Sequence, residues 1–384
     1  MLGHLSVADV CNVLSRRAVQ LLALVMPLWL NACGGGSSSD SGAPTPPPVS
    51  DIAHLHISDS SLMDNDGKAV NLRGWNWGRW GTAQPQDAAD NVAQGANAVR
   101  IPLRWWGYYS NTNNDSRDDS QTDTVGIDVH HLEVLDAMIA QASAAHLWII
   151  LFVDSDCGQN GTQTADDIAY CDPDGQYPDG HNFWSDPDAR AKFIQVWRFV
   201  ATRYKDTPYL ALFEPLPEPD PTGVDDSEIT AFYDQIISEI RAVASGIPFL
   251  VGPRLYQMKI VERAYHAQWP DVVYTGNLFV HTGQTQEQNI ADLQFRLSQL
   301  TTLRNNYHVP VFIQQTGVES GEDPDMTYLN ALLSLINSNS VGYTYWTYRD
   351  TFNPYSYGVK YQDGNGGWST KETVLATISD YFKQ

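Results

Sequence analysis

Basic side chains are scarce in this sequence. Its 384 residues include 23 lysines and arginines against 45 aspartates and glutamates, for a formal net charge of −22 at pH 7. Nucleic acid and anionic membrane surfaces repel so acidic a chain, so we exclude both as partners. A neutral polysaccharide carries no such penalty, and 12 tryptophans and 19 tyrosines could offer flat faces to sugar rings. The composition therefore permits a carbohydrate partner without proving one.

A long apolar run is missing near the start of the chain. Residues 18–30 are mostly apolar, follow Arg16 and Arg17, and lie just before Cys33. This run is shorter than the ~20 residues that a membrane-spanning helix needs, so it predicts a signal peptide. We expect cleavage before Cys33 and lipid attachment to its thiol, which would anchor the exported protein at the bacterial cell envelope, on the outer membrane or cell surface. The alternative is an ordinary secretory signal in which Cys33 is incidental.

Bulky side chains are almost absent after Cys33. Residues 34–50 are rich in glycine, serine and proline, with Val49 as their one bulky apolar residue. Such a segment cannot bury enough surface to fold, so it predicts a flexible tether. The expected parts are thus a signal peptide at 1–32, a tether at 33–50 and a folded region at 51–384, long enough for one large barrel or two ordinary domains.

Cysteine is rare, and two of the four cysteines lie at or before position 33. The other two, Cys157 and Cys171, are 14 positions apart in a polar segment of a chain that we expect to be exported. An oxidising compartment favours a disulfide between them, worth about 3 kcal/mol in the chain-entropy description. A metal site is the weaker alternative, because His181 is the only nearby imidazole. We expect no metal and no cofactor.

A glycine-rich phosphate loop is missing after the first predicted strand, which argues against a dinucleotide-binding fold. Instead, a hairpin with an Asp66-Gly67 turn is followed by short apolar strands that alternate with helical patterns. Eight such repeats predict an α/β fold, a closed (β/α)8 TIM barrel preceded by a short hairpin, and we expect a monomer. The predicted strands are 70–75, 96–103, 147–153, 209–219, 248–253, 272–281, 309–317 and 341–348. The predicted helices are 130–145, 189–205, 227–245, 256–268, 288–306, 327–339 and 372–382.

Function in such a barrel lies at the carboxyl ends of the strands. Over residues 53–382 the chain resembles glycoside hydrolase family 5, the cellulase and mannanase type of barrel. The matching segments are NLRGWNWG, NAVRIPLRW, FWSDPDARAKFIQVWRFVATRYKDTPYLALFEPLPEP, VPVFIQQTG and GYTYWTYRD. The resemblance implies hydrolysis of a β-linked polysaccharide or oligosaccharide, of the β-glucan type, by two glutamates that retain the anomeric configuration. One follows strand four in an Asn-Glu-Pro motif, and the other precedes a glycine on strand seven.

The resemblance also implies roles for individual residues. Glu218 takes the place of the acid and base on strand four, and Arg100 orients the group on strand seven. His281 and Trp346 line the subsite of cleavage, with Trp346 stacked under the sugar. Further substrate-binding positions are Asp154, Trp75 and Tyr274. Structural alternatives remain: an ion pair between Glu218 and Arg100, a core histidine at 281 and simple packing of Trp346.

Three positions depart from the family pattern. Pro217 replaces the asparagine before Glu218, Asp154 stands where a histidine is frequent, and Gln315 occupies the place of the nucleophile. The last is the most serious, because a neutral amide cannot supply the charge that attacks the anomeric carbon.

Three hypotheses about function remain open. In the first, the protein is a hydrolase in which Asp154, Asp156 or Glu319 activates a water. In the second, it is an inactive barrel that binds carbohydrate at the cell surface. In the third, it is a purely structural lipoprotein.

Overall fold

The computed structural model describes residues 52–78, 82–103, 129–153, 184, 187–219, 224–252, 269–280, 283–319, 323, 326–350, 357–363 and 365–384. The expected signal peptide, tether and lipidation site lie outside these residues, as do Cys157 and Cys171. Asp154, Asp156, His281 and the predicted helix at 256–268 also lie outside them. None of the described helices has the length and apolar character needed to span a membrane.

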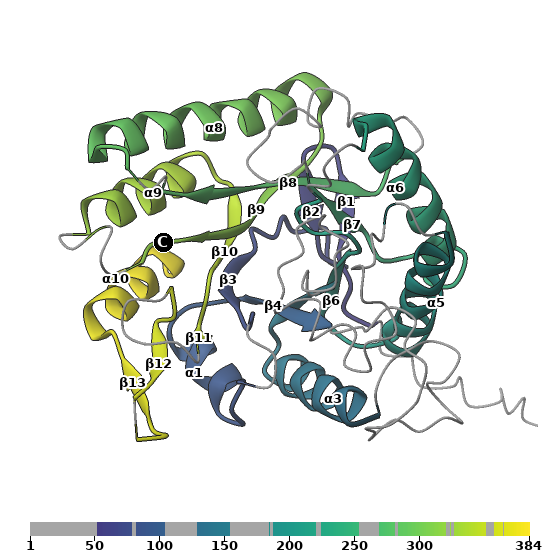
Figure 1. Cartoon of the computed structure of the whole chain (residues 1–384), viewed down its shortest axis with the longest axis horizontal. Helices are drawn as coiled ribbons and strands as arrows, with labels where there is room; N and C mark the ends of the chain where they lie inside the picture. Colours follow the sequence, from purple (N-terminus) through teal and green to yellow (C-terminus); the bar gives the residue numbers. More distant parts are fainter. Residues whose placement is uncertain are drawn as a thin grey trace, which may run out of the picture. The chain divides into compact units, whose positions relative to one another are not determined.

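Eight parallel strands form a closed barrel in the order β10-β3-β4-β5-β6-β7-β8-β9 (Figure 1). The eight predicted strands correspond to them in chain order, so the TIM-barrel prediction is confirmed. Their bounds are β3 (Arg73–Asn76), β4 (Ala98–Leu103), β5 (Trp148–Val153), β6 (Leu210–Glu214), β7 (Phe249–Val251), β8 (Val272–Phe279), β9 (Val311–Gly317) and β10 (Gly342–Tyr345).

Helices cover the outside of this barrel (Figure 1). Most of them match predicted segments, but the short helix α1 was not predicted. The described helices are α1 (Asp87–Ala93), α3 (Val129–Ala144), α5 (Pro187–Tyr204), α6 (Asp226–Arg241), α8 (Gln286–Tyr307), α9 (Thr327–Ser338) and α10 (Glu372–Phe382).

A two-stranded hairpin precedes the barrel, as predicted. It consists of β1 (His56–Ser58) and β2 (Ser61–Met63), and its tight turn contains Asp59 in the left-handed region at φ 53°. Aspartate tolerates this conformation better than most residues. The turn expected at Asp66-Gly67 comes next and leads back to a single bridge between Met63 and Ala69. The prediction thus found the second turn and missed the first.

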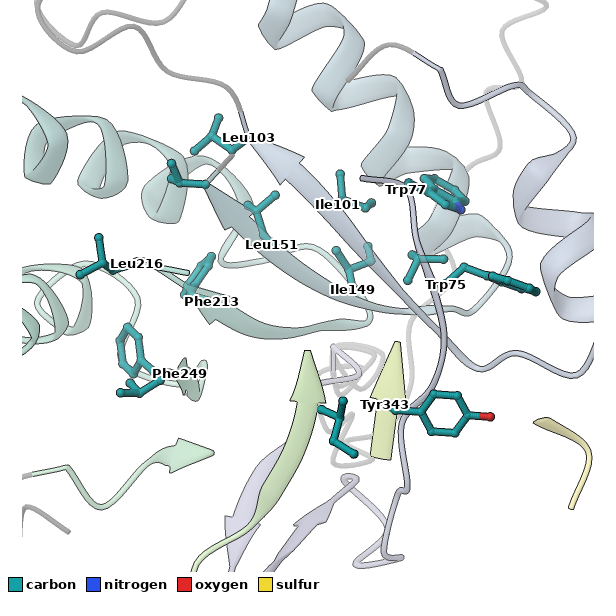
Figure 2. Close-up of a cluster of buried hydrophobic side chains, with 14 of the residues drawn as sticks. Trp75, Trp77, Ile101, Leu103, Ile149, Leu151, Phe213, Leu216, Phe249 and Tyr343 are labelled. Carbon is teal, nitrogen blue, oxygen red and sulfur yellow. The ribbon is translucent and has the colours of Figure 1, made fainter. Parts of the chain in front are cut away.

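The core has two apolar layers, one on each face of the barrel sheet. On β5, Ile149 and Leu151 belong to the larger layer, which includes helix residues, whereas Ile150 belongs to the smaller layer inside the barrel. Figure 2 shows part of the larger layer. Successive residues of a strand point to opposite faces, so a strand buried on both faces is apolar throughout. Polar residues on the inner face of such strands therefore stand out.

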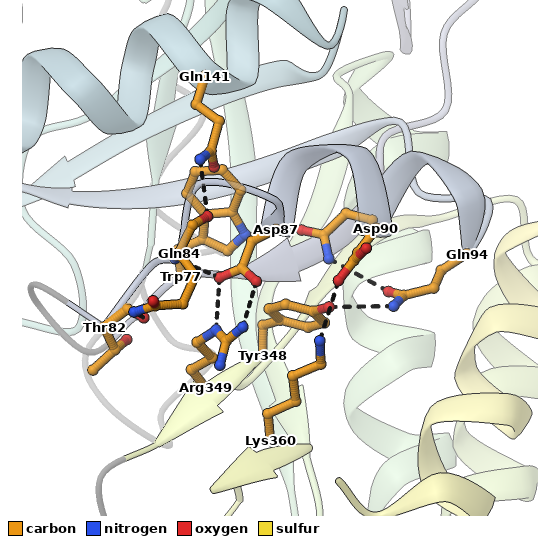
Figure 3. A network of polar contacts seen from close by, with 11 residues as sticks. Trp77, Thr82, Gln84, Asp87, Asp90, Gln94, Gln141, Tyr348, Arg349 and Lys360 are labelled. Atoms are coloured by element: carbon orange, nitrogen blue, oxygen red, sulfur yellow. Dashed lines mark hydrogen bonds and ion pairs between the residues drawn. The ribbon is translucent and has the colours of Figure 1, made fainter. Parts of the chain in front are cut away.

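The C-terminal region adds a small three-stranded sheet that was not predicted. It comprises β11 (Arg349–Asp350), β12 (Lys360–Gln362) and β13 (Trp368–Thr370). Arg349 binds Asp87 of α1 through two hydrogen bonds, Nε to Oδ2 at 2.7 Å and Nη2 to Oδ1 at 2.6 Å, and both side chains are buried (Figure 3). This ion pair connects β11, which follows the barrel strand β10, to α1, which follows the barrel strand β3.

Candidate active site at the carboxyl end of the barrel

A buried ion pair lies on the inner face of the barrel. Arg100 of β4 donates from Nε to Glu214 Oε2 at 2.6 Å and from Nη2 to Glu214 Oε1 at 2.9 Å. Both side chains are fully buried, and the guanidinium carbon is 3.4 Å from the centre of the Phe152 ring. Nη1 donates to Asn76 Oδ1 at 2.9 Å. The paired geometry is the strongest that arginine and a carboxylate can form, so Glu214 provides the main counter-charge for Arg100.

Sequence reasoning missed Glu214. It expected Arg100 to orient position 315, or to pair with Glu218. A signal was present, because Glu214 ends a strand, Leu210–Glu214, whose other residues are all apolar and buried. A carboxylate in such a strand requires a buried cation, and Arg100 occupies the equivalent inner face two strands away.

Glu218 follows β6 by four residues and is half-buried. Its backbone is in the left-handed region at φ 48°. Asn277 of β8 donates from Nδ2 to Glu218 Oε1. Burial raises the pKa of the Glu218 carboxyl to about 7; the charge of Glu214 adds to this rise, while Arg100 and hydrogen bonds from Asn277 and Gln314 oppose it. A carboxyl with this pKa can both give and take a proton near neutral pH.

Gln315 links Glu218 to Arg100. With its amide oxygen turned toward Arg100, Gln315 donates to Glu218 Oε1 at 2.9 Å and accepts from Arg100 Nη1 at 3.1 Å. Of the residues expected from the sequence, the structure therefore brings Arg100, Glu218 and Gln315 together. Their arrangement is a continuous chain of hydrogen bonds, with a neutral amide between the cation and the carboxyl group.

A β-bulge in β9 explains how two consecutive glutamines reach this site. Ile313 pairs with Gly276 of β8, but the next pair is Gln315 with Asn277, so Gln314 is the extra residue. The pairing with β10 shifts in the same stretch. A bulge re-aims side chains that would otherwise alternate between the two faces. The bulge leaves the side chains of Gln314 and Gln315 close enough to Glu218 to donate hydrogen bonds to its carboxyl group.

Two amide oxygens at this site have no hydrogen-bond partner among the described residues: Gln314 Oε1 and Asn277 Oδ1. Their side chains are only 2% and 8% exposed. Sequence reasoning missed both residues and chose His281 from the same stretch, although Asn277 is the residue of β8 that pairs with Gln315.

Trp346 directly follows β10 and is half-buried. Its indole lies against the backbone of Gly78, where an added Cβ would come within 2.0 Å of the ring atom Cζ3. Its backbone N–H donates to Thr316 O at 2.8 Å. Glycine at position 78 is therefore required for the ring to occupy this place, just beyond the end of β3.

The other expected site residues lie elsewhere or outside the described residues. Trp75 and Tyr274 are at most 1% exposed and belong to the layer between strands and helices. Trp75 packs edge-on against Tyr345 and Phe382. This placement does not support the substrate-binding role expected for either residue.

Glu319 is half-buried and lies close enough to Lys371 to affect its ionisation. Burial lowers the pKa of Lys371 to about 8, while Asp350 and Glu319 oppose the decrease. In the described part of the chain, no group of three or more histidines, cysteines or carboxylates is placed to hold a metal ion.

Comparisons with known proteins address the family and the fold of the chain. The sequence model of the cellulase family, glycosyl hydrolase family 5, matches residues 63–351. A β-xylosidase of Phanerodontia chrysosporium is 23% identical over 237 residues, which are 50% of this chain and 44% of that protein, so the match spans less than half the relative's length.

Solved structures of two bacterial glycanases share the fold. The catalytic domain of a mannanase from Streptomyces sp. SirexAA-E is 18% identical with a TM-score of 0.60, and the match covers 90% of this chain and 98% of that one. The catalytic domain of the major endoglucanase of Xanthomonas campestris pv. campestris is also 18% identical, with a TM-score of 0.57 and coverage of 86% and 99%.

Proposed function

Because the chain belongs to glycosyl hydrolase family 5, we propose that it is an O-glycosyl hydrolase that acts on a β-linked polysaccharide or oligosaccharide of the β-glucan type. The observation that carries this proposal is the state of Glu218, a half-buried carboxyl whose pKa burial raises to about 7 at the carboxyl end of the barrel. The activities named for its relatives, on mannan, glucan and xyloside, share cleavage of a glycosidic bond.

In this proposal Glu218 is the general acid. With a pKa near 7, about half of the molecules carry the proton at neutral pH, and the proton passes to the glycosidic oxygen as the bond to the sugar breaks. Asn277 and Gln315 hold the carboxyl through amide donors. The Arg100–Glu214 pair in turn fixes Gln315 through Arg100 Nη1. Half-buried Trp346 provides an aromatic face for the sugar.

The group that completes the reaction is not Gln315, because an amide is too weak a nucleophile to attack the anomeric carbon. An inverting route uses a carboxylate about 6.5 to 9.5 Å from the acid to activate water. Asp154, Asp156 and Glu319 are the candidates within this proposal. Each would yield a product of inverted configuration.

A second function is favoured by one observation, the neutral Gln315 in contact with Glu218. It is an inactive barrel that binds carbohydrate at the cell surface. For either function we propose an exported monomer, attached to the membrane only by a lipid on Cys33.

The proposal is tested by incubating the purified protein with β-glucan and mannan. Reducing ends are then assayed, and the configuration of the product is determined by NMR. We expect reducing sugar to be released and Glu218→Gln to abolish the release. Glu239→Gln is the matched control, because Glu239 lies on helix α6 in an exposed ion pair with Arg198 and should leave the rate unchanged. Saccharide binding in calorimetry without release of reducing sugar from any glycan would favour the binding protein and contradict the hydrolase.

A further inference from the structure

Glu218, which follows β6, provides an acid at the barrel mouth, but the described strands provide no free anion opposite it. Glu214 is bound by Arg100 through both carboxylate oxygens, and Gln315 is neutral. Within the described residues, Glu214 is the one carboxylate whose charge raises the pKa of Glu218. A cationic sugar intermediate would therefore gain no charge stabilisation from the strand-seven position of this barrel.

Amides take the place of that anion. Asn277, Gln314 and Gln315 all direct hydrogen bonds to the Glu218 carboxyl. The oxygen of Gln315 is occupied by Arg100, but the oxygens of Gln314 and Asn277 are buried and have no partner in the described structure. A buried acceptor without a donor is destabilising, so each of these oxygens favours the arrival of a donor. The site therefore has two acceptors suited to an N–H group brought by a ligand.

A glycine packs closely against one of these acceptors. Gly252 directly follows β7, and a Cβ added there would lie 3.5 Å from Gln314 Oε1 and 3.3 Å from Thr275 Cγ2. The missing side chain leaves the Gln314 oxygen facing backbone instead of a methyl group.

From these observations we propose that the substrate is a β-linked 2-acetamido-2-deoxyhexoside whose own acetamido group serves as the nucleophile. This inference rests on the proposed glycosidase activity with Glu218 as the acid, and it replaces the β-glucan substrate and the inverting route given above. The acetamido carbonyl oxygen bonds to the anomeric carbon as the bond from that carbon to the leaving oxygen breaks. The proton of Glu218 passes to the leaving oxygen. The products of this step are a free alcohol, a cyclic oxazolinium ion and the Glu218 carboxylate.

The second step uses water alone. Glu218 accepts a proton from a water molecule, whose oxygen bonds to the anomeric carbon while the bond to the acetamido oxygen breaks. The acetamido group is restored, Glu218 is protonated again, and the configuration is retained because two inversions have occurred. The oxazolinium N–H, which carries positive charge, donates to the free oxygen of Gln314 or Asn277.

This chemistry selects the substrate. A 2-hydroxyl group cannot replace the acetamido oxygen, because its attack would close a strained three-membered ring instead of a five-membered one. The acetamido group must also lie on the face opposite the leaving oxygen, as it does in gluco and galacto sugars. The proposal therefore commits to N-acetylglucosamine or N-acetylgalactosamine in β linkage at the cleaved position.

The test compares matched oligosaccharides on the wild-type protein. Chitotriose and cellotriose differ in the acetamido groups, and we expect kcat/KM to be at least about 100-fold higher for chitotriose, with retained configuration in the product. On aryl β-N-acetylglucosaminides, replacement of acetyl by trifluoroacetyl weakens the carbonyl nucleophile and should lower kcat at least about tenfold. The 1,2-thiazoline of N-acetylglucosamine, a stable mimic of the cyclic intermediate, should inhibit competitively.

Two variants examine the residues. Gln315→Glu supplies an anion, so it should make cellotriose cleavable and reduce the preference for chitotriose. Gln314→Leu removes one free acceptor together with the amide that donates to Glu218, and it should lower kcat more on chitotriose than on an aryl β-glucoside, because only the acetamido substrate uses the acceptor. The wild-type comparisons decide the proposal even if either variant fails to fold.

The outcomes separate this inference from the proposed function. Cleavage of cellotriose as fast as chitotriose, or inversion of configuration, would overturn the acetamido proposal and leave the hydrolase standing, with Asp154, Asp156 or Glu319 as the base. Failure to cleave any glycan would overturn both.

Discussion

Replacement of Glu218 by glutamine should stabilise the protein at alkaline pH while it abolishes hydrolysis. The carboxyl has a pKa of about 7 in the folded protein and a reference value of 4.5. The folded state therefore binds this proton more tightly than the unfolded chain does. Between pH 4.5 and pH 7, folding stability falls as the pH rises, because the folded state has to release a proton that the unfolded chain has already lost.

The size of this effect follows from the difference in pKa. At 1.36 kcal/mol for each unit, the shift from 4.5 to about 7 corresponds to at most about 3 kcal/mol of lost stability above pH 7. Glutamine has no proton to lose and keeps a similar shape. The Glu218→Gln variant should thus approach 3 kcal/mol of extra stability at pH 8 and show little difference at pH 4.5.

Urea unfolding of wild type and variant at pH 4.5, 6 and 8 measures the difference between their free energies of unfolding. The other titratable groups contribute equally to both proteins, so their contributions cancel in this difference. Glu239→Gln is the control, because an exposed pair contributes less than about 1 kcal/mol at any pH. A difference that does not change with pH, or a variant that is less stable than wild type at pH 8, would refute the reasoning about Glu218.

Three further predictions concern other parts of the chain. Asp87→Asn leaves the cation of Arg349 buried without its partner, so the free energy of unfolding in a urea titration should fall by about 3–5 kcal/mol; an unchanged midpoint would contradict this. Cys33→Ser should move the protein from the membrane fraction to the soluble fraction after cell lysis, and a wild-type protein that is itself soluble and unlipidated would rule out the anchor. Peptide mapping without reductant should recover Cys157 joined to Cys171, whereas two free thiols in exported protein would exclude the disulfide.

The sequence allowed the barrel to be predicted because its strands are apolar on both faces and alternate with amphipathic helices. Segments such as 147–153 and 309–317 correspond closely to β5 and β9. The short strands of the C-terminal sheet escaped prediction, since β11 has two residues and β12 and β13 have three each. Elements of that length carry no measurable periodicity.

The sequence predicted correctly which residues lie together where a motif names them. It was wrong where the position depends on which face of a strand the residue occupies. Arg100, Glu218 and Gln315 were correctly placed together. Trp75 is adjacent to Asn76 in the same motif, but successive residues of a strand face opposite sides. Asn76 reaches Arg100, whereas Trp75 packs against α10.

Local patterns and their order along the chain were sufficient to predict the fold class and to select Glu218 as the candidate acid. The groups around Glu218 could be identified only from the folded chain. Arg100 and Glu214 are 114 positions apart, and the Gln315 amide of β9 joins Arg100 of β4 to Glu218, which follows β6. Such contacts depend on barrel closure, on strand register and on one bulged residue in β9, and these arise from the packing of the whole chain, which no local pattern contains.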